Sequence, residues 1–152
     1  MPDMSDALKE QILASQNECT LIWNTQDGNS TGTMITFVWY KQRIWMSTHE
    51  DMARIRAIRR NPNTTVVVTS SGTEFGKDRS ITFRGQCRIH KGSAVNDEFI
   101  PAFVGKLSPR TEKSAKELSD LLGDAGNCVL EFIPEKEIRY DGHDYLMALR
   151  YD

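Results

Sequence analysis

Apolar and polar residues alternate along several stretches of the chain, and this alternation predicts β-strands. The clearest stretch runs from Arg79 to His90, where every second residue is apolar or small: Ile81, Phe83, Gly85, Cys87 and Ile89. Shorter strands are predicted over residues 19–25, 31–40, 43–48, 64–69, 127–133 and 137–140. Gly85 inside its strand predicts a bulge, a bend or a close backbone approach. The run Val66-Val67-Val68 is expected to be buried on both faces, and Pro134 is expected to break its strand.

Helical spacing of apolar residues is found over residues 5–15, 50–60 and 95–104. In the second of these predicted helices, Met52, Ile55 and Ile58 share one face. Arg54 projects from the flank of that face, close to the start of the helix. Its side chain is therefore expected to reach back over the end of the preceding strand while its stem stays packed.

A fourth helix is predicted after Ser108-Pro109, which are expected to supply the N-cap and a first-turn proline, and Gly123 or Gly126 is expected to end it. The predicted elements are six or seven strands, mostly antiparallel, with helices inserted between them. The fold class is therefore mainly β with helices (α+β). Closure into a small barrel would remove the exposed edges of such a sheet. With 152 residues, the chain is expected to form a single domain over residues 1–152.

Composition and charge exclude several classes of function. The chain has 19 basic and 21 acidic residues, a net charge of −2, which argues against a general nucleic-acid-binding protein. No apolar run is long enough to span a membrane, and residues 1–16 do not resemble a signal peptide. The three cysteines are far apart and are expected to be reduced thiols of a cytoplasmic protein: Cys19, Cys87 and Cys128. No spacing of His, Cys and acidic residues predicts a metal site.

The most informative stretch joins a strand that ends at Ser47-Thr48 to the basic helix that contains Arg54. Hydroxyl groups, the N-terminus of a helix and an arginine together favour an anion-binding site. An alternative interpretation is that Thr48 only caps the helix, with Asp51 as its capping-box partner. Glu50 and Asp51 would also oppose an anion unless their carboxylates point away.

The order of these features resembles the pyridoxamine 5′-phosphate oxidase-like flavoproteins. The resemblance rests on Ser47-Thr48, on Arg54 six residues after that threonine and on Asn61-Pro62 after the helix. It continues through residues 65–68 and 82–87 and returns at Pro134 and at Tyr140-Asp141-Gly142.

The resemblance implies a split β-barrel that binds FMN, usually at the interface of a homodimer. Ser47 and Thr48 match a strand-end pair that contacts the flavin phosphate and ribityl chain. Arg54 matches a phosphate-binding lysine, and the fork of an arginine suits a phosphate at least as well.

Other matching positions concern the flavin ring. Met34, Ile35 and Thr36 match the strand whose backbone lies along the isoalloxazine. Ser80 falls near a position that contacts the flavin from the second subunit. The three tryptophans are expected in the core or at an interface instead of on the flavin: Trp23, Trp39 and Trp45.

The sequence also departs from the oxidase itself. Ala53 replaces an arginine before the phosphate-binding position, and Gly32 and Phe37 stand nearest to two basic positions of the second strand. The tryptophan and arginine that serve the vitamin substrate have no counterpart near Tyr140. Oxidation of pyridoxamine phosphate is therefore not expected.

With these departures, the resemblance implies instead an FMN-binding flavoprotein, an oxidoreductase acting on another small molecule. The flavin would carry the electrons in such an enzyme, so the protein needs no acid or base catalyst of its own, and none is visible in the sequence. A deazaflavin-dependent reductase of the same fold is one alternative. A non-catalytic protein that binds flavin or haem is another, and His143 is the one residue that raises the haem-degrading branch. His49, beside the predicted phosphate site, is a second histidine whose role is left open.

Overall fold

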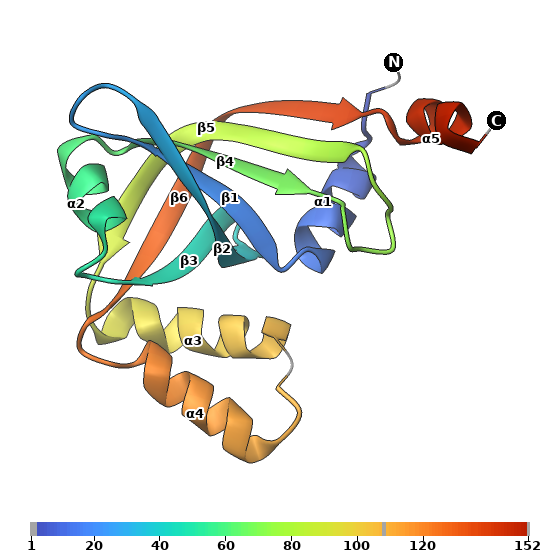
Figure 1. The fold of residues 1–152 in the computed structure, drawn as a ribbon. Helices are drawn as coiled ribbons and strands as arrows, with labels where there is room; N and C mark the ends of the chain where they lie inside the picture. Colours follow the sequence, from blue (N-terminus) through green and yellow to red (C-terminus); the bar gives the residue numbers. More distant parts are fainter. Residues whose placement is uncertain (1–2, 108, 152) are drawn as a thin grey trace.

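The computed structural model describes residues 3–107 and 109–151, and it shows a closed β-barrel with helices at its ends and on one side (Figure 1). The six strands are β1 (Glu18–Asn24), β2 (Ser30–Tyr40), β3 (Arg43–His49), β4 (Asn63–Thr69), β5 (Arg79–His90) and β6 (Asn127–Asp141). They close in the order β1-β2-β3-β6-β5-β4, and every neighbouring pair is antiparallel. The predicted α+β fold with an antiparallel barrel is thereby confirmed.

The barrel is split between β2 and β3. The ladder between these strands joins Phe37–Tyr40 to Arg43–Met46, and it ends at the pair Phe37 and Met46. The first half of β2 therefore pairs with β1 alone. On its other edge, backbone groups between residues 30 and 36 meet no strand of the described chain.

Within the described residues, five helices accompany the barrel: α1 (Asp6–Ser15), α2 (Ala53–Arg60), α3 (Ser93–Leu107), α4 (Glu112–Leu122) and α5 (His143–Tyr151). Ile12 and Leu13 of α1 and Ile55 and Ile58 of α2 join the core cluster of the barrel interior. A second apolar cluster forms outside the barrel, where Phe99 and Phe103 of α3 pack near Val38. The α3–α4 hairpin projects from this side (Figure 1).

Several helix boundaries differ from the predicted ones. α2 begins at Ala53 instead of Glu50, and Met52, which was expected on the apolar face, is the N-cap and is 47% exposed. α4 begins at Glu112, and the Thr111 hydroxyl caps it by accepting from the amide of Ser114. The predicted N-cap Ser108 lies outside the described residues, and Pro109 precedes the helix. α4 ends at Leu122 with Gly123 as its C-cap, one of the two glycines predicted to end it, whereas α5 had no predicted counterpart.

The expected break at Pro134 is wrong, because β6 runs through it as one strand. Pro134 pairs with Gly85, at the point where the register between β5 and β6 shifts. A side chain at Gly85 would place its Cβ 2.1 Å from the carbonyl oxygen of Ile133. Gly85 thus marks both the predicted bulge and the predicted close approach, and a proline is tolerated at such a bulge. The described part of the chain has six strands and not seven, because the two predicted C-terminal strands are one.

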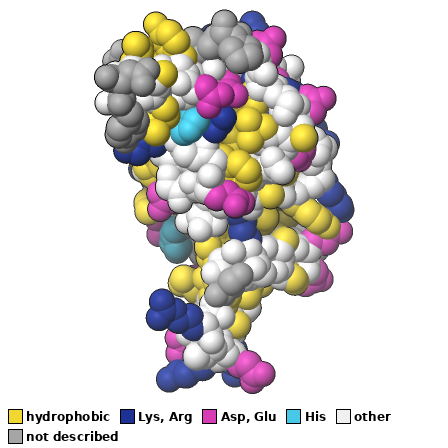
Figure 2. Space-filling view, turned by 90° about the vertical axis from the view of Figure 1, so that its right-hand side faces the viewer, with side chains coloured by type: hydrophobic (Ala, Val, Ile, Leu, Met, Phe, Trp, Pro, Cys, Tyr) yellow, Lys and Arg dark blue, Asp and Glu magenta, His cyan; other side chains and the backbone are white. Residues whose placement is uncertain are grey.

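Burial along β4 alternates instead of covering both faces. Val66 and Val68 are buried in the core, whereas Val67 points outward and is half-buried. The outward face of β4 continues across its neighbours β1 and β5. In Figure 1, none of the described helices covers this face. Figure 2, viewed from the side of α1 and α5, shows hydrophobic side chains between charged ones, and charged side chains at the tip of the α3–α4 hairpin.

The three cysteines, Cys19, Cys87 and Cys128, are buried and free. Burial raises the pKa of Cys19 to about 12 and that of Cys87 to about 11. Both thiols therefore stay protonated at neutral pH and are poor nucleophiles. Among the described helices, none is long and apolar enough to cross a membrane.

Candidate functional site

The junction between β3 and α2 brings Thr48 and Arg54 together, as the sequence predicted. Thr48 is the sixth residue of β3 and is 6% exposed, and Arg54 is the second residue of α2 and is half-buried. The Nε of Arg54 donates to the hydroxyl oxygen of Thr48 at 2.7 Å. This contact uses one donor of the guanidinium and fixes the direction of the side chain. The Thr48 hydroxyl keeps its own proton for another acceptor.

The charge of Arg54 has no carboxylate partner among the described ion pairs. Burial lowers the pKa of Arg54, and no nearby acid appears as an opposing cause. Half-buried arginines elsewhere in the chain do have partners, for example Arg79 with Asp141 at 3.0 Å and Arg139 with Asp6 at 2.7 Å. A partly desolvated guanidinium without a counter-charge is costly unless an anion neutralises it.

Glu50 and Asp51, the two acids that follow Thr48, have partners other than Arg54. The carboxylate of Glu50 binds the ammonium of Lys91, and this hydrogen bond is the main cause that lowers the pKa of Glu50. Asp51 is exposed at 86% of its side chain and lies 3.5 Å from Nδ1 of His49. The junction is therefore not filled by its own carboxylates.

Thr48 does not cap α2, so the alternative interpretation of this residue is wrong. The N-cap is Met52, and within the described part of the chain the helix has no side-chain cap hydrogen bond. Helix N-termini without a capping side chain keep amide donors available for an anion.

Ser47 points to the other side of β3. Burial alternates along the strand, so Thr48 faces the side of Met46 and Ser47 the side of Trp45. The Ser47 hydroxyl donates to Oδ1 of Asn127 at 2.5 Å, and Nδ2 of Asn127 donates to the carbonyl of Leu122 at 2.8 Å. Within one chain, the structure does not bring the Ser47 side chain to Thr48 and Arg54.

The predicted ring-contacting residues lie on the free edge of β2. The amide of Phe37 donates to the carbonyl of Asn17 at 3.0 Å, which directs the backbone groups of Phe37 toward β1. Alternation then directs the amides and carbonyls of Met34 and Thr36 to the opposite edge, beyond the end of the β3 ladder. Ile35 is buried in the core, and the side chain of Met34 is 58% exposed.

Ser80 lies at the opposite end of β5 from the junction. It pairs with Thr69 and Tyr140, whereas His90, at the other end of β5, pairs with Val129. Ser80 and His90 are ten positions apart along the strand, about 33 Å at the usual rise. Ser80 therefore cannot join Thr48 and Arg54 of its own chain, and its predicted role requires a second subunit.

His49 and His143, the two histidines whose roles the sequence left open, each have a hydrogen-bond partner in the chain. Nδ1 of His49 accepts from the amide of Asp51 at 3.2 Å, and Nδ1 of His143 lies 2.7 Å from the carbonyl oxygen of Lys77. Over the described residues, no group of three His, Cys, Asp or Glu side chains is placed to hold a metal ion.

Sequence reasoning missed Lys91 and Asn127, which decide where Glu50 and Ser47 point. Each is far from its partner in the chain, by 41 residues for Lys91 and 80 for Asn127. Neither contact leaves a local pattern in the sequence.

An antiparallel barrel that closes through β6 but is split between the first half of β2 and β3 defines the class of split-barrel proteins. A family model described as pyridoxamine 5′-phosphate oxidase matches residues 4–123 of the sequence. The chain belongs to this family, which binds flavins.

Solved structures show the same fold. A conserved hypothetical protein from Mycobacterium tuberculosis superposes with a TM-score of 0.78 at 17% identity, covering 93% of this chain and 88% of that one. An F420 reductase gives a TM-score of 0.64 at 16% identity, with coverages of 85% and 94%. An FAD-binding protein from Mesorhizobium loti gives 0.63 at 15% identity, with coverages of 91% and 94%. No curated protein matches the sequence.

Proposed function

We propose that this protein is an FMN-binding oxidoreductase that acts on a small molecule other than pyridoxamine phosphate. The observation that carries the proposal is the half-buried guanidinium of Arg54, which touches Thr48 and has no carboxylate partner in the described ion pairs. A phosphate monoester supplies the charge that this arginine lacks, and its oxygens suit the guanidinium fork.

The donors at the junction fit the phosphate of FMN. Arg54 offers the remaining nitrogens of its guanidinium, Thr48 offers its hydroxyl proton, and the first turn of α2 offers amides that no side chain caps. Glu50 is held by Lys91, so its charge does not compete for these donors.

The free edge of β2 suits a flat heterocycle with several hydrogen-bonding atoms. Thr36 and Met34 direct amides and carbonyls to this edge, and Met34 adds an exposed apolar side chain. Bound FMN would supply the electron or hydride transfer. The residues of this chain would orient it, bind its phosphate and limit the access of water, and none of them is assigned as a catalytic acid or base.

We also propose a homodimer in which the uncovered face of the barrel meets a second copy. The register aligns one outward residue from each of five neighbouring strands in a single row, Met34, Thr20, Val67, Thr82 and Ile138. This row is threonine and apolar side chains, without a charge. Such a face suits a protein interface, and a partner there could bring its own Ser80 toward the flavin.

An absorbance spectrum of the purified protein, followed by titration with FMN, tests the proposal. Flavin absorption bands and release of FMN on denaturation support it. Uptake of the F420 deazaflavin with no uptake of FMN would favour the reductase alternative, which the likeness to an F420 reductase keeps open. A protein that takes up neither, or only haem, would contradict the proposal. Bleaching by a nicotinamide donor and reoxidation by an acceptor would separate an enzyme from a carrier.

A further inference from the structure

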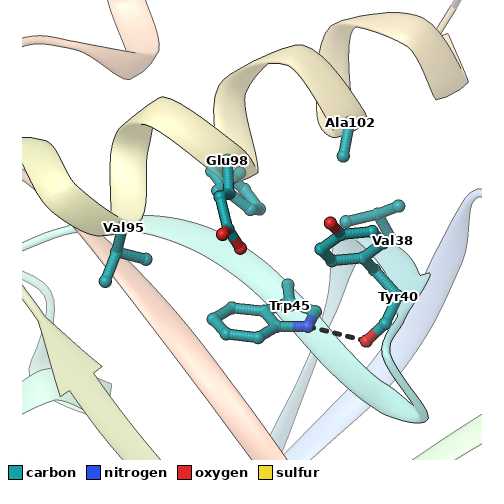
Figure 3. Close-up of a pocket in the computed structure, with 7 residues that line it drawn as sticks. Val38, Tyr40, Trp45, Val95, Glu98 and Ala102 are labelled. Carbon is teal, nitrogen blue, oxygen red and sulfur yellow. Dashed lines mark hydrogen bonds between the residues drawn. The ribbon is translucent and has the colours of Figure 1, made fainter.

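A cavity of about 250 Å³ lies between α3 and the outer face of β2 and β3 (Figure 3). Its walls are aromatic and aliphatic, and are formed by Val38, Tyr40, Trp45, Val95, Phe99 and Ala102. Pockets for drug-sized ligands usually measure about 300–1,000 Å³. This cavity therefore suits a smaller molecule, such as a single ring with a short side chain.

Glu98 is the one charged residue among those that line the cavity, and its carboxylate points toward Trp45 (Figure 3). The ammonium of Lys41 binds this carboxylate at 2.9 Å and lies 5.2 Å from the centre of the Tyr40 ring. The hydrogen bond to Glu98 is the main cause that raises the pKa of Lys41. The protein thus already places a cation close to a carboxylate and an aromatic ring that both line the cavity.

A second, more polar hollow adjoins the first, since both are lined by Trp45 and Glu98. This second hollow is lined by two carboxylates, those of Glu98 and Glu131. Glu131 is buried and is bound by Arg43 and by Nε2 of His90. Because both oxygens of Glu131 are occupied, it has little capacity for another cation. Glu98, whose partner is one exposed and flexible lysine, is the carboxylate that can exchange partners.

We propose that this cavity is a second ligand site, which binds a small aromatic or aliphatic molecule carrying one ammonium group. The apolar part enters between Trp45 and Phe99, and the ammonium replaces that of Lys41 on Glu98. The site is separate from the cofactor junction, because Trp45 and Thr48 point to opposite faces of β3. It does not depend on the proposed flavin function.

The experiment is a titration of the protein with phenethylammonium and with neutral phenethyl alcohol, followed by nitrogen–proton correlation NMR. The indole Nε1 of Trp45 donates to the carbonyl of Tyr40 at 2.9 Å beside the cavity, so its signal reports on the site. A Trp45→Phe variant identifies this signal among the three indoles of the chain. We expect a saturable shift with both probes and about fivefold tighter binding of the ammonium, as for a partly exposed ion pair.

Two substitutions test whether the cavity is a ligand-binding site or only a gap in the packing. Glu98→Gln should reduce the affinity for phenethylammonium to that for the alcohol. Lys41→Met should tighten ammonium binding about threefold to fivefold, because it removes the competing cation. Lys113→Met is the matched control, since Lys113 also pairs with a glutamate, Glu117 at 4.0 Å on the surface of α4, and it should change nothing.

A third variant, Ala102→Leu, should fill the cavity and abolish the binding of both probes. The proposal is overturned if the Trp45 signal shows no saturable shift in the unmodified protein. It is also overturned if Glu98→Gln leaves the preference for the ammonium unchanged.

Discussion

Arg54 and Thr48 are joined by a hydrogen bond of 2.7 Å from Nε to the hydroxyl oxygen, across the junction of β3 and α2. The five residues between them turn the chain from the strand into the helix. The bond holds a half-buried positive charge over the end of the strand, with no carboxylate in the described ion pairs to neutralise it. The proposed function depends on this arrangement, because it assigns the missing negative charge to the phosphate of FMN.

Replacing Thr48 by valine should weaken FMN binding by about 1 kcal/mol, because the variant loses one hydroxyl contact to the phosphate and one that orients Arg54. Ser47→Ala is the informative companion. Ser47 bonds to Asn127 on the other side of β3, so its loss should lower stability by about 1 kcal/mol and leave FMN affinity nearly unchanged. Fluorescence titration with FMN and urea unfolding measure the two effects. Equal losses of affinity in both variants would place Ser47 in the site, as the family resemblance implies.

Gly85→Ala should destabilise the fold by about 1–3 kcal/mol, because the added Cβ would overlap the carbonyl oxygen of Ile133 at 2.1 Å. Gly105→Ala provides the control, since a Cβ at that position in α3 meets nothing within 4 Å. This second change should stabilise the helix by up to about 1 kcal/mol. Denaturant unfolding compares the two variants. A Gly85→Ala protein as stable as the parent would show that the close contact between β5 and β6 can relax.

Lys106 gives a prediction about pH. Burial lowers the pKa of its ammonium to about 8 from the ordinary 10.5, although the Phe37 ring, 3.9 Å from Nζ, favours the charged form. Between these two values the unfolded chain binds a proton that the folded protein has released, so stability from this group rises with pH. Below pH 8 both states are protonated and the contribution is constant.

The difference in unfolding free energy between the parent and Lys106→Met isolates this effect. It should be flat from pH 6 to about 7 and should shift in favour of the parent as the pH passes about 8 and approaches 10. Lys113→Met, at an exposed site, should show no such shift. A flat difference over the whole range would mean that Phe37 offsets the cost of burial.

The proposed dimer predicts that Ile138→Glu yields a monomer. Ile138 is 49% exposed and ends the row of uncharged side chains across the barrel. A carboxylate there would be desolvated at an interface without a partner. Leu121→Glu, at an exposed leucine of α4 outside that row, is the control and should leave the assembly unchanged. Light scattering after gel filtration measures both, and a dimer that tolerates Ile138→Glu would exclude this face as the interface.

Local sequence patterns predicted the strands of the barrel because alternation depends on burial of one face. They failed where two distant segments meet. Taken by itself, Pro134 predicts the end of a strand. In the structure it pairs with Gly85 of the neighbouring strand, at a bulge where the register shifts. Only the pairing of the two strands shows that the chain can continue.

In the candidate site, too, the local contacts could be predicted from the sequence and the contacts between distant segments could not. Arg54 reached Thr48 as predicted, because both lie within one short segment whose geometry is local. The start of α2 moved from Glu50 to Ala53, since the amide of Glu50 bonds to the carbonyl of Gly126 at 2.8 Å. The direction of Ser47 likewise depends on Asn127. Gly126 and Asn127 lie more than 70 residues away from these partners in the sequence. Their contacts therefore produce no local pattern in residues 47–54.

The most direct test of the proposed function is the dissociation constant of FMN for Arg54→Ala, beside the parent and Arg60→Ala. Arg60 is exposed at the end of the same helix and provides the matched loss of one positive charge. We expect Arg54→Ala to weaken binding by about 1.5–3 kcal/mol, roughly tenfold to 150-fold, and Arg60→Ala to change it by less than about twofold. An FMN affinity that is the same in all three proteins would contradict the proposal that Arg54 binds the flavin phosphate.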